Sequence, residues 1–113
     1  MCGIAGFIGK KEISKINIVE TLNLMKNRGP DFQSYFNFSH NNSNISLLHS
    51  RLSIIDIDPR SNQPYLDNNC ILVFNGEIYN YLEIKEELTE LGVSFKTESD
   101  TEVLIYGYKE WGI

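Results

Sequence analysis

An expected β-hairpin in the middle of this 113-residue chain places the strongest limit on its fold. Residues 35–38 are aromatic and strand-like, residues 40–44 form a polar turn, and residues 45–52 supply the returning strand. A hairpin pairs its strands antiparallel, whereas a doubly wound sheet needs parallel strands joined by long crossover connections. The hairpin therefore favours a mixed α+β or layered fold.

Three amphipathic patterns predict helices around this hairpin. The first begins at the N-cap Ser14 and ends before Gly29 and Pro30. The second ends at Gly92, and the third opens at residue 99, where a serine and Glu102 have capping-box spacing. The apolar positions that define the helices are Ile16, Ile18, Val19, Leu22 and Met25 in the first, Tyr81, Ile84, Leu88 and Leu91 in the second, and Leu104, Tyr108 and Trp111 in the third.

Three further segments are predicted to be strands. Residues 1–9 alternate loosely among glycines, residues 70–74 form an apolar run typical of a buried strand, and residues 93–97 alternate. Residues 58–64 have the composition of a surface loop, and residues 67–69 that of a turn. These elements together predict one small α+β domain.

Composition narrows the classes of function. The net charge is −5 and no cluster of Lys or Arg occurs, which argues against nucleic acid or an anionic membrane as the main partner. No apolar run approaches membrane-spanning length. Cys2 and Cys70 lack the spacing of metal ligands or of a disulfide framework, so we expect no metal site and a cytoplasmic protein with reduced thiols. Cys70 opens an apolar run and is expected to be a buried structural thiol.

Cys2 follows the initiator methionine directly, and removal of Met1 would make it the N-terminal residue. That residue would then carry a thiol together with a free α-amino group, whose ordinary pKa of roughly 7.7–8.0 is far below that of a lysine. A thiol beside its own base is a plausible activated nucleophile. Taken alone, a cysteine at this position can also be without any function.

Four polar segments interrupt the apolar elements, at residues 28–31, 49–51, 74–77 and 99–100. Their side chains are complementary to an amino acid. Arg51 suits an α-carboxylate, Glu77 and Asp100 suit an ammonium group, and Asn75 with the amide of Gly76 suits a developing oxyanion. Each segment in isolation also fits a structural role, as a helix end, a cap, a turn or a solvated strand residue. His40 and His49 are expected to be ordinary loop and strand residues.

Taken in order, these motifs resemble those of class II (N-terminal nucleophile, Ntn) glutamine amidotransferases. The chain opens with Cys-Gly-Ile-Ala-Gly at residues 2–6 and continues with Arg-Gly-Pro-Asp, His-Ser-Arg-Leu-Ser-Ile-Ile-Asp, Phe-Asn-Gly-Glu-Ile-Tyr-Asn and Ser-Asp-Thr-Glu. Within that superfamily it is similar to the glutaminase domain of glutamine-hydrolysing asparagine synthetases. Residues 51–56 and 75–80 favour this branch over those of glucosamine-phosphate synthase and amidophosphoribosyltransferase.

The resemblance implies a four-layer αββα sandwich of antiparallel sheets and a role for each matching residue. Cys2 would attack the side-chain amide of glutamine, with Asn75 and Gly76 forming the oxyanion hole. The implied substrate-binding residues are Arg51 for the α-carboxylate, Glu77 and Asp100 for the α-ammonium group, and the backbone near Ile54. Arg28 and Asp31 are expected to organise the site without taking part in a chemical step.

The resemblance also sets expectations for cofactors and partners. Glutamine hydrolysis would need no cofactor; ATP and Mg²⁺ would serve only a C-terminal ATP-pyrophosphatase (synthetase) domain, whose phosphate-binding loop does not occur in residues 1–113. A Gly-Met-Phe-Ala-Phe-type segment of the family domain is also absent, so we expect a partial glutaminase domain with exposed apolar sheet surface. The expected partners are glutamine and the synthetase domain, and a homodimer is compatible with the resemblance. Two alternatives remain open: an amidotransferase with a sugar or peptide acceptor, and a non-catalytic truncated remnant.

Overall fold

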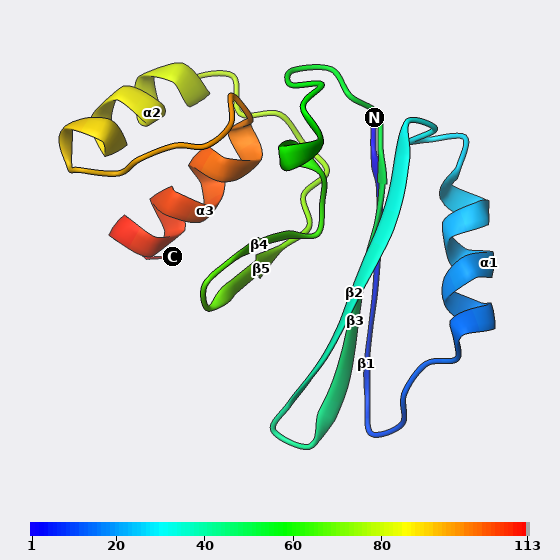
Figure 1. Ribbon diagram of the computed structural model, residues 1–113. Coiled ribbons are helices and arrows are strands. Elements are labelled where there is room, and N and C mark those ends of the chain that lie inside the picture. Colours follow the sequence, from blue (N-terminus) through cyan, green and yellow to red (C-terminus); the bar gives the residue numbers. More distant parts are fainter. Residues whose placement is uncertain (113) are drawn as a thin grey trace.

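The chain, seen in a computed structural model that describes residues 1–112, contains two antiparallel sheets and three α-helices (Figure 1). The strands are β1 (Gly3–Gly9), β2 (Phe32–His40), β3 (Ser43–Arg51), β4 (Tyr65–Asp67) and β5 (Cys70–Leu72). The helices are α1 (Lys15–Met25), the short 3₁₀ turn η1 (Pro59–Ser61), α2 (Tyr81–Glu90) and α3 (Asp100–Trp111). The first sheet has the order β1-β3-β2, and β4 pairs only with β5. The predicted α+β class with antiparallel sheets is confirmed.

The hairpin between β2 and β3 turns through two asparagines. Asn41 and Asn42 have φ values of 47° and 60°, and they join the paired residues His40 and Ser43. A two-residue hairpin turn of this kind needs positive φ at both central positions, a conformation that asparagine adopts more readily than most residues. The turn fixes the register of the whole hairpin, so that Leu48 of β3 lies opposite Tyr35 of β2.

Helix α1 covers one face of the three-stranded sheet. Ser14 caps the helix as predicted, because its side chain accepts a hydrogen bond of 3.2 Å from the amide of Asn17. The buried residues Ile18 and Leu22 pack with Leu48 of β3, and Ala5, Ile13 and Met25 surround this core. The predicted apolar stripe was partly wrong: Ile16 and Val19 are 70% and 44% exposed. Three-residue spacing alone drifts around a helix of 3.6 residues per turn, whereas positions 18, 22 and 25 stay on one face.

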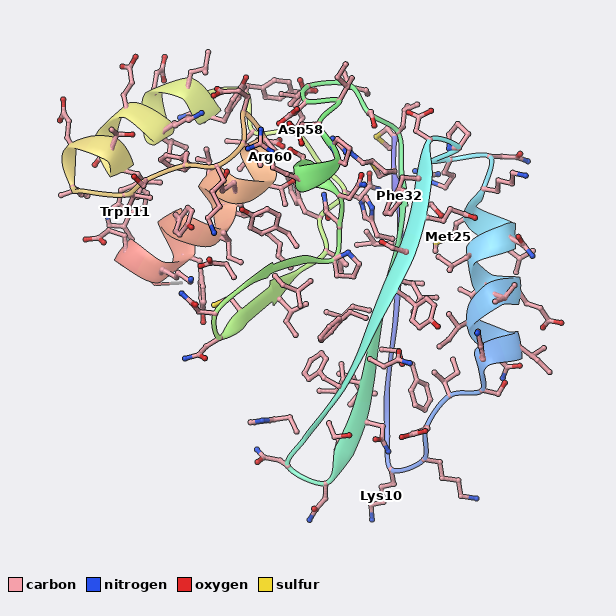
Figure 2. All side chains as sticks on the ribbon, viewed as in Figure 1. Lys10, Met25, Phe32, Asp58, Arg60 and Trp111 are labelled. Atoms are coloured by element: carbon pink, nitrogen blue, oxygen red, sulfur yellow. The ribbon has the colours of Figure 1, made fainter. Side chains whose placement is uncertain are left out.

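The turn that follows α1 lies very close to β3. A Cβ on Gly29 would come within 2.1 Å of the backbone oxygen of Ser50, so only glycine fits there. Gln33 of β2 joins the same elements, since its Nε2 donates to the carbonyl of Leu22 at 2.5 Å and to Oγ of Ser50 at 2.7 Å. Figure 2 shows Met25 pointing from α1 towards the sheet.

The remaining elements lie on the other side of the three-stranded sheet. In Figure 1 the β4–β5 hairpin and then α3 follow on the side opposite α1, with α2 beside α3. The sheet itself leaves apolar side chains exposed on that side, with Ile4 46% and Ile8 73% exposed. Leu88 of α2 and Val103 and Ile105 of α3 are buried.

The predicted strand at residues 93–97 does not form. The carboxylate of Glu102, which is fully buried, accepts hydrogen bonds from the amides of Lys96 and Thr97 and from the Thr97 hydroxyl, at 2.6 to 3.1 Å. The backbone amides that would pair with a neighbouring strand therefore donate to a buried carboxylate instead. The predicted helix after residue 99 is confirmed, but only half of the capping box is present: Ser99 caps the amide of Thr101, while Glu102 binds this loop.

The predicted buried strand at residues 70–74 is shorter and more exposed than expected. Strand β5 ends at Leu72, and its residues, including Cys70, are only half-buried because the sheet has a single neighbouring strand. Residues 58–64 were also predicted wrongly as a surface loop, since Ser61, Gln63 and Pro64 are buried. One contact accounts for part of both differences: the amide of Phe74 donates to Oε1 of Gln63 instead of to a strand.

Candidate active site

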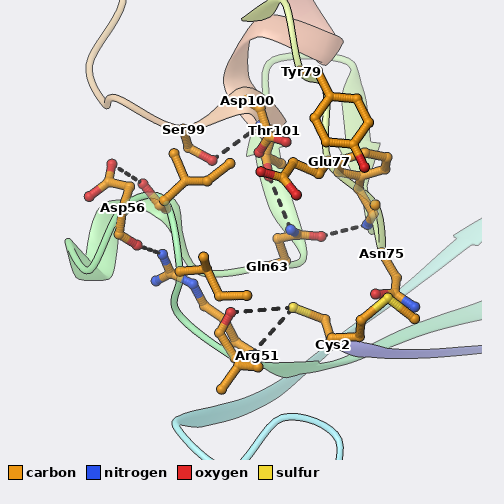
Figure 3. A pocket seen from close by; sticks show the side chains of 17 residues that line it. Cys2, Arg51, Asp56, Gln63, Asn75, Glu77, Tyr79, Ser99, Asp100 and Thr101 are labelled. Carbon is orange, nitrogen blue, oxygen red and sulfur yellow. Dashed lines mark hydrogen bonds between the residues drawn. The ribbon is translucent and has the colours of Figure 1, made fainter.

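A cavity of about 310 Å³ lies where the three-stranded sheet meets the start of α3 (Figure 3). All seven residues predicted to act on or bind the substrate line it: Cys2, Arg51, Ile54, Asn75, Gly76, Glu77 and Asp100. They come from four separate parts of the chain, namely the residue before β1, the end of β3 with the loop that follows, residues 74–79, and α3. The fold thus brings together groups that are up to 98 positions apart in the sequence.

Cys2 is half-buried beside the end of β3. The amide of Leu52 donates to Sγ of Cys2 at 3.3 Å, and the thiol lies 3.7 Å from the carbonyl oxygen of Leu52, to which it donates. Figure 3 places Cys2 and Asn75 next to each other at one end of the cavity. Met1 also lines the cavity and is 72% exposed, so its removal would uncover the amine of Cys2 at the cavity wall.

Arg28 and Asp31 lie outside the cavity and bind the backbone of residues next to it. Nε of Arg28 donates to the carbonyl of Cys2 at 3.1 Å. A carboxylate oxygen of Asp31 accepts from the amide of Ser53 at 2.7 Å, and the amide of Asp31 donates to the carbonyl of Arg51 at 3.0 Å. Both residues therefore connect the segment after α1 with the strand ends that carry Cys2 and Arg51.

Arg51 is 7% exposed and is held by the loop that follows β3. Its NH1 donates to the carbonyl of Asp58 at 3.1 Å and to Oδ1 of Asn62 at 2.7 Å, and its NH2 donates to the carbonyl of Asp56. Three of the five N–H groups of the guanidinium thus have protein acceptors. This contact with the loop is a role of Arg51 that the sequence did not indicate.

The segment that contains Asn75 and Gly76 begins at Phe74, whose backbone is held on two sides. Besides the bond from its amide to Gln63, its carbonyl oxygen lies 3.3 Å from Nε2 of His49. The pKa of His49 is lowered to about 4, chiefly by burial. The positive charge of Arg51 lowers the pKa further, and the hydrogen bond with the Phe74 carbonyl raises it by less than burial lowers it. His49 is therefore neutral at pH 7, and a neutral ring must carry its proton on Nε2 to donate to that carbonyl.

Asp100 is the first residue of α3 and is only 6% exposed. One of its carboxylate oxygens accepts from the amide of Ile78 at 3.1 Å, which ties residues 75–78 to the helix. A carboxylate at this position is also stabilised by the helix dipole. Glu77 is exposed and lies near Asp100 in Figure 3, so two acidic side chains approach the cavity together.

Several residues of the site were not predicted. Gln63, Ser99, Thr101 and Tyr79 line the cavity, and Asp56 supports its rim. Burial opposes ionisation of Asp56, but hydrogen bonds from Ser61 and from the amides of Asp58 and Glu98 outweigh it and lower its pKa. His49 was predicted to be an ordinary strand residue, although it is completely buried and contacts the segment before Asn75. Gln63 could not be recognised from the sequence, because it lies in a polar segment with the composition of a surface loop.

Within residues 1–112, no three His, Cys, Asp or Glu side chains are grouped as a metal site requires. No helix in the same range is long and apolar enough to cross a membrane. The cavity is lined by a thiol, an arginine, three carboxylates (Asp56, Glu77 and Asp100) and an amide-bearing segment, a set that is complementary to an amino acid with a side-chain amide.

Comparison with known proteins agrees with this chemistry. The chain matches the family described as the glutamine amidotransferase domain over residues 1–113, and it belongs to that family. It is 39% identical to asparagine synthetase 1 (glutamine-hydrolysing) of Bacillus subtilis strain 168, over 98% of this chain and 18% of that protein. Two other glutamine-hydrolysing asparagine synthetases of this organism, numbers 2 and 3, are 37% and 33% identical, over 100% and 98% of this chain.

The chain spans less than a fifth of the length of these three relatives, namely 18%, 15% and 18%. The resemblance seen in the sequence motifs is thereby confirmed at the level of the family. The similarity to asparagine synthetases covers only the matched 15–18% of each relative.

Proposed function

We propose that this chain is the glutaminase part of a glutamine-dependent asparagine synthetase, converting glutamine to glutamate and ammonia. The observation that carries the proposal is that one cavity is lined both by Cys2 and by the groups expected to bind an amino acid. Membership of the glutamine amidotransferase family supports it. The expected four-layer αββα sandwich belongs to the same proposal, since α1, the two sheets and α3 already follow one another in that order.

The proposed reaction begins once Met1 has been removed. The α-amine of Cys2 takes the thiol proton, and the sulfur attacks the side-chain carbonyl carbon of glutamine. The carbonyl oxygen becomes negative and is stabilised by Asn75 and the amide of Gly76. The C–N bond then breaks, and the nitrogen leaves as ammonia with the proton that the amine returns. Water attacks the resulting thioester, releasing glutamate and restoring the thiol.

The other residues of the cavity are proposed to bind the substrate. The two N–H groups of Arg51 that have no acceptor within residues 1–112 would meet the α-carboxylate of glutamine. Asp100, whose position is fixed by the amide of Ile78, and the more exposed Glu77 would hold the α-ammonium group. The backbone at Ile54 would complete the pocket, while Arg28 and Asp31 keep the strand ends in place.

The similarity to asparagine synthetases is the basis for a proposal about how the ammonia is used. In the whole protein, a C-terminal synthetase domain would use the ammonia for the ATP-dependent amidation of aspartate, with ATP and Mg²⁺ bound only there. Amidation of a sugar or peptide acceptor would leave the glutaminase chemistry unchanged. Assays of the full-length protein with aspartate and with these other acceptors distinguish the two reactions.

The chain offers a matched pair of variants for testing the glutaminase step. Ammonia release from glutamine is measured for the wild type with a processed N-terminus, for Cys2→Ala, and for Cys70→Ala as the control cysteine outside the cavity. We expect activity in the wild type and in Cys70→Ala, and none in Cys2→Ala. Equal activity in all three proteins would reject Cys2 as the nucleophile, and no activity in the processed wild type would reject the proposal in favour of a non-catalytic remnant.

A further inference from the structure

The backbone of Phe74 leads directly into Asn75, and side chains hold it where a strand partner would otherwise do so. Its amide donates to Oε1 of Gln63 at 2.5 Å, and its carbonyl oxygen lies 3.3 Å from Nε2 of His49. When the donor and the acceptor of one residue are both engaged, its backbone dihedral angles are restricted. The direction in which Asn75 and Gly76 enter the cavity therefore depends on these two contacts.

Gln63 connects Phe74 with the rest of the site. Its Nε2 donates to Oγ1 of Thr101 at 3.1 Å, directly after Asp100, and its backbone carbonyl accepts from the hydroxyl of Ser34 in β2. The residue is 6% exposed and lines the cavity, where Figure 3 shows its side-chain amide between Thr101 and the segment before Asn75. One residue thus joins the sheet, the segment before Asn75 and the start of α3.

We infer that Gln63 is a positioning residue for glutamine hydrolysis, which holds Asn75 and Gly76 at a fixed distance from Asp100. Its side-chain amide suits this role because one atom accepts from Phe74 while the other donates to Thr101. A carboxylate could not donate to Thr101 in the same way, and an apolar side chain would leave the Phe74 amide unpaired. The inference rests on the proposed function and adds to it a residue outside the predicted set.

Loss of the Gln63 contacts should change kcat and KM to different extents. Donors to the oxyanion act mainly in the transition state, so their displacement lowers kcat more than it raises KM. The guanidinium of Arg51 is held by acceptors of the loop after β3 and not by Phe74, so the contact with the α-carboxylate should survive the loss of Gln63. His49 would still hold the Phe74 carbonyl, leaving the segment attached but less restricted.

The test compares Gln63→Met with Gln33→Met in the chain with a processed N-terminus. Gln33 is the matched control, because its side chain also makes two hydrogen bonds, here as a donor in both, but on the α1 side of the sheet. For Gln63→Met we expect kcat to fall roughly 10- to 100-fold, with KM changed less than about threefold. For Gln33→Met we expect lower stability with an unchanged kcat. An unchanged kcat in Gln63→Met, or an equal fall in both variants, would overturn the inference.

Amide hydrogen exchange of the unsubstituted chain tests the hydrogen bond without any variant. We expect the Phe74 amide to be protected, and exchange at the rate of an exposed loop amide would overturn the inference even if Gln63→Met fails to fold. The two proposals fail in different ways. Absence of ammonia release from the processed wild type would reject the proposed function, whereas an active wild type with an equally active Gln63→Met would reject the role of Gln63 alone.

Discussion

The amide of Leu52 donates to the sulfur of Cys2 at 3.3 Å, although the two residues are 50 positions apart in the sequence. The nucleophile proposed for this domain is therefore oriented by the end of a neighbouring strand as well as by its own backbone. Arg28 adds a second restraint through the carbonyl of Cys2. The N-terminal residue of an active form would thus be held on both sides.

The position of the α-amine can be tested by inserting one alanine between Met1 and Cys2. The thiol stays in the chain, but the free amine then belongs to another residue and no longer lies beside the sulfur. Loss of a positioned base typically costs 10²- to 10⁴-fold, so we expect ammonia release to fall by at least about 100-fold. Mass spectrometry of the purified chains establishes each N-terminus, and an insertion variant with full activity would exclude the α-amine as the base.

Replacement of Asp100 by asparagine tests the binding of the α-ammonium group. The asparagine side chain keeps an acceptor for the amide of Ile78, so the fold should be retained while the negative charge is lost. Hydrogen bonds to charged groups contribute about 1.5–3 kcal/mol, which predicts a rise in KM of roughly 10- to 100-fold. Asp67→Asn, whose partner Lys109 lies outside the cavity, is the control. An unchanged KM for Asp100→Asn would exclude this role.

The buried neutral His49 predicts a loss of stability in mild acid. Its pKa is lowered from 6.5 to about 4 in the folded chain, chiefly by burial, so the unfolded chain binds more protons between these pH values. The free energy of unfolding should therefore fall as the pH drops from about 6.5 to about 4, by up to roughly 3 kcal/mol.

A His49→Gln variant provides the comparison for this pH dependence, because it removes the titrating ring. Chemical unfolding of both proteins at a series of pH values measures the difference between them. The carboxylates near Arg51 contribute in another range, since the pKa values of Asp56 and Asp58 are lowered and their effects appear at more acidic pH. The same slope in both proteins between pH 6.5 and 4 would show that His49 is not the group responsible.

Gly29→Ala tests the close approach of the turn after α1 to β3. The new Cβ would lie 2.1 Å from the backbone oxygen of Ser50, which cannot move without disturbing the sheet. We expect the free energy of unfolding to fall by about 1–3 kcal/mol, the usual cost of overpacking. Gly6→Ala serves as control, because its Cβ would lie 3.5 Å from the nearest backbone atom. Equal stability of the two variants would contradict the predicted clash.

The sequence predicted those parts of the fold that depend on local patterns. The Asn41 and Asn42 turn, the Ser14 cap and the α+β class follow from turn chemistry, capping and periodicity, which act over a few residues. The strand expected at residues 93–97 was wrong because the competing partner, the buried Glu102, comes from a helix further along the chain. Alternation cannot reveal a carboxylate that takes the place of a strand.

The candidate site shows the same division. Motif resemblance singled out seven residues that line one cavity, together with Arg28 and Asp31 behind it. The roles of Gln63 and His49 were not predicted, because both side chains contact the backbone of Phe74. A backbone contact does not require a particular side chain at the partner position, so it leaves no motif in the sequence. Their side chains are common in loops and strands, so only the folded arrangement distinguishes them.

The two faces of strand β3 limit which mutations this domain can accept during evolution. One of its faces contributes Leu48 to the core beneath α1, while the other carries His49, whose neighbour two positions on, Arg51, lines the cavity. A shift of the strand by one residue would move both sets to the wrong side at once. Substitutions on either face can be accommodated one at a time, but an insertion or deletion between residues 43 and 51 would remove core and site together.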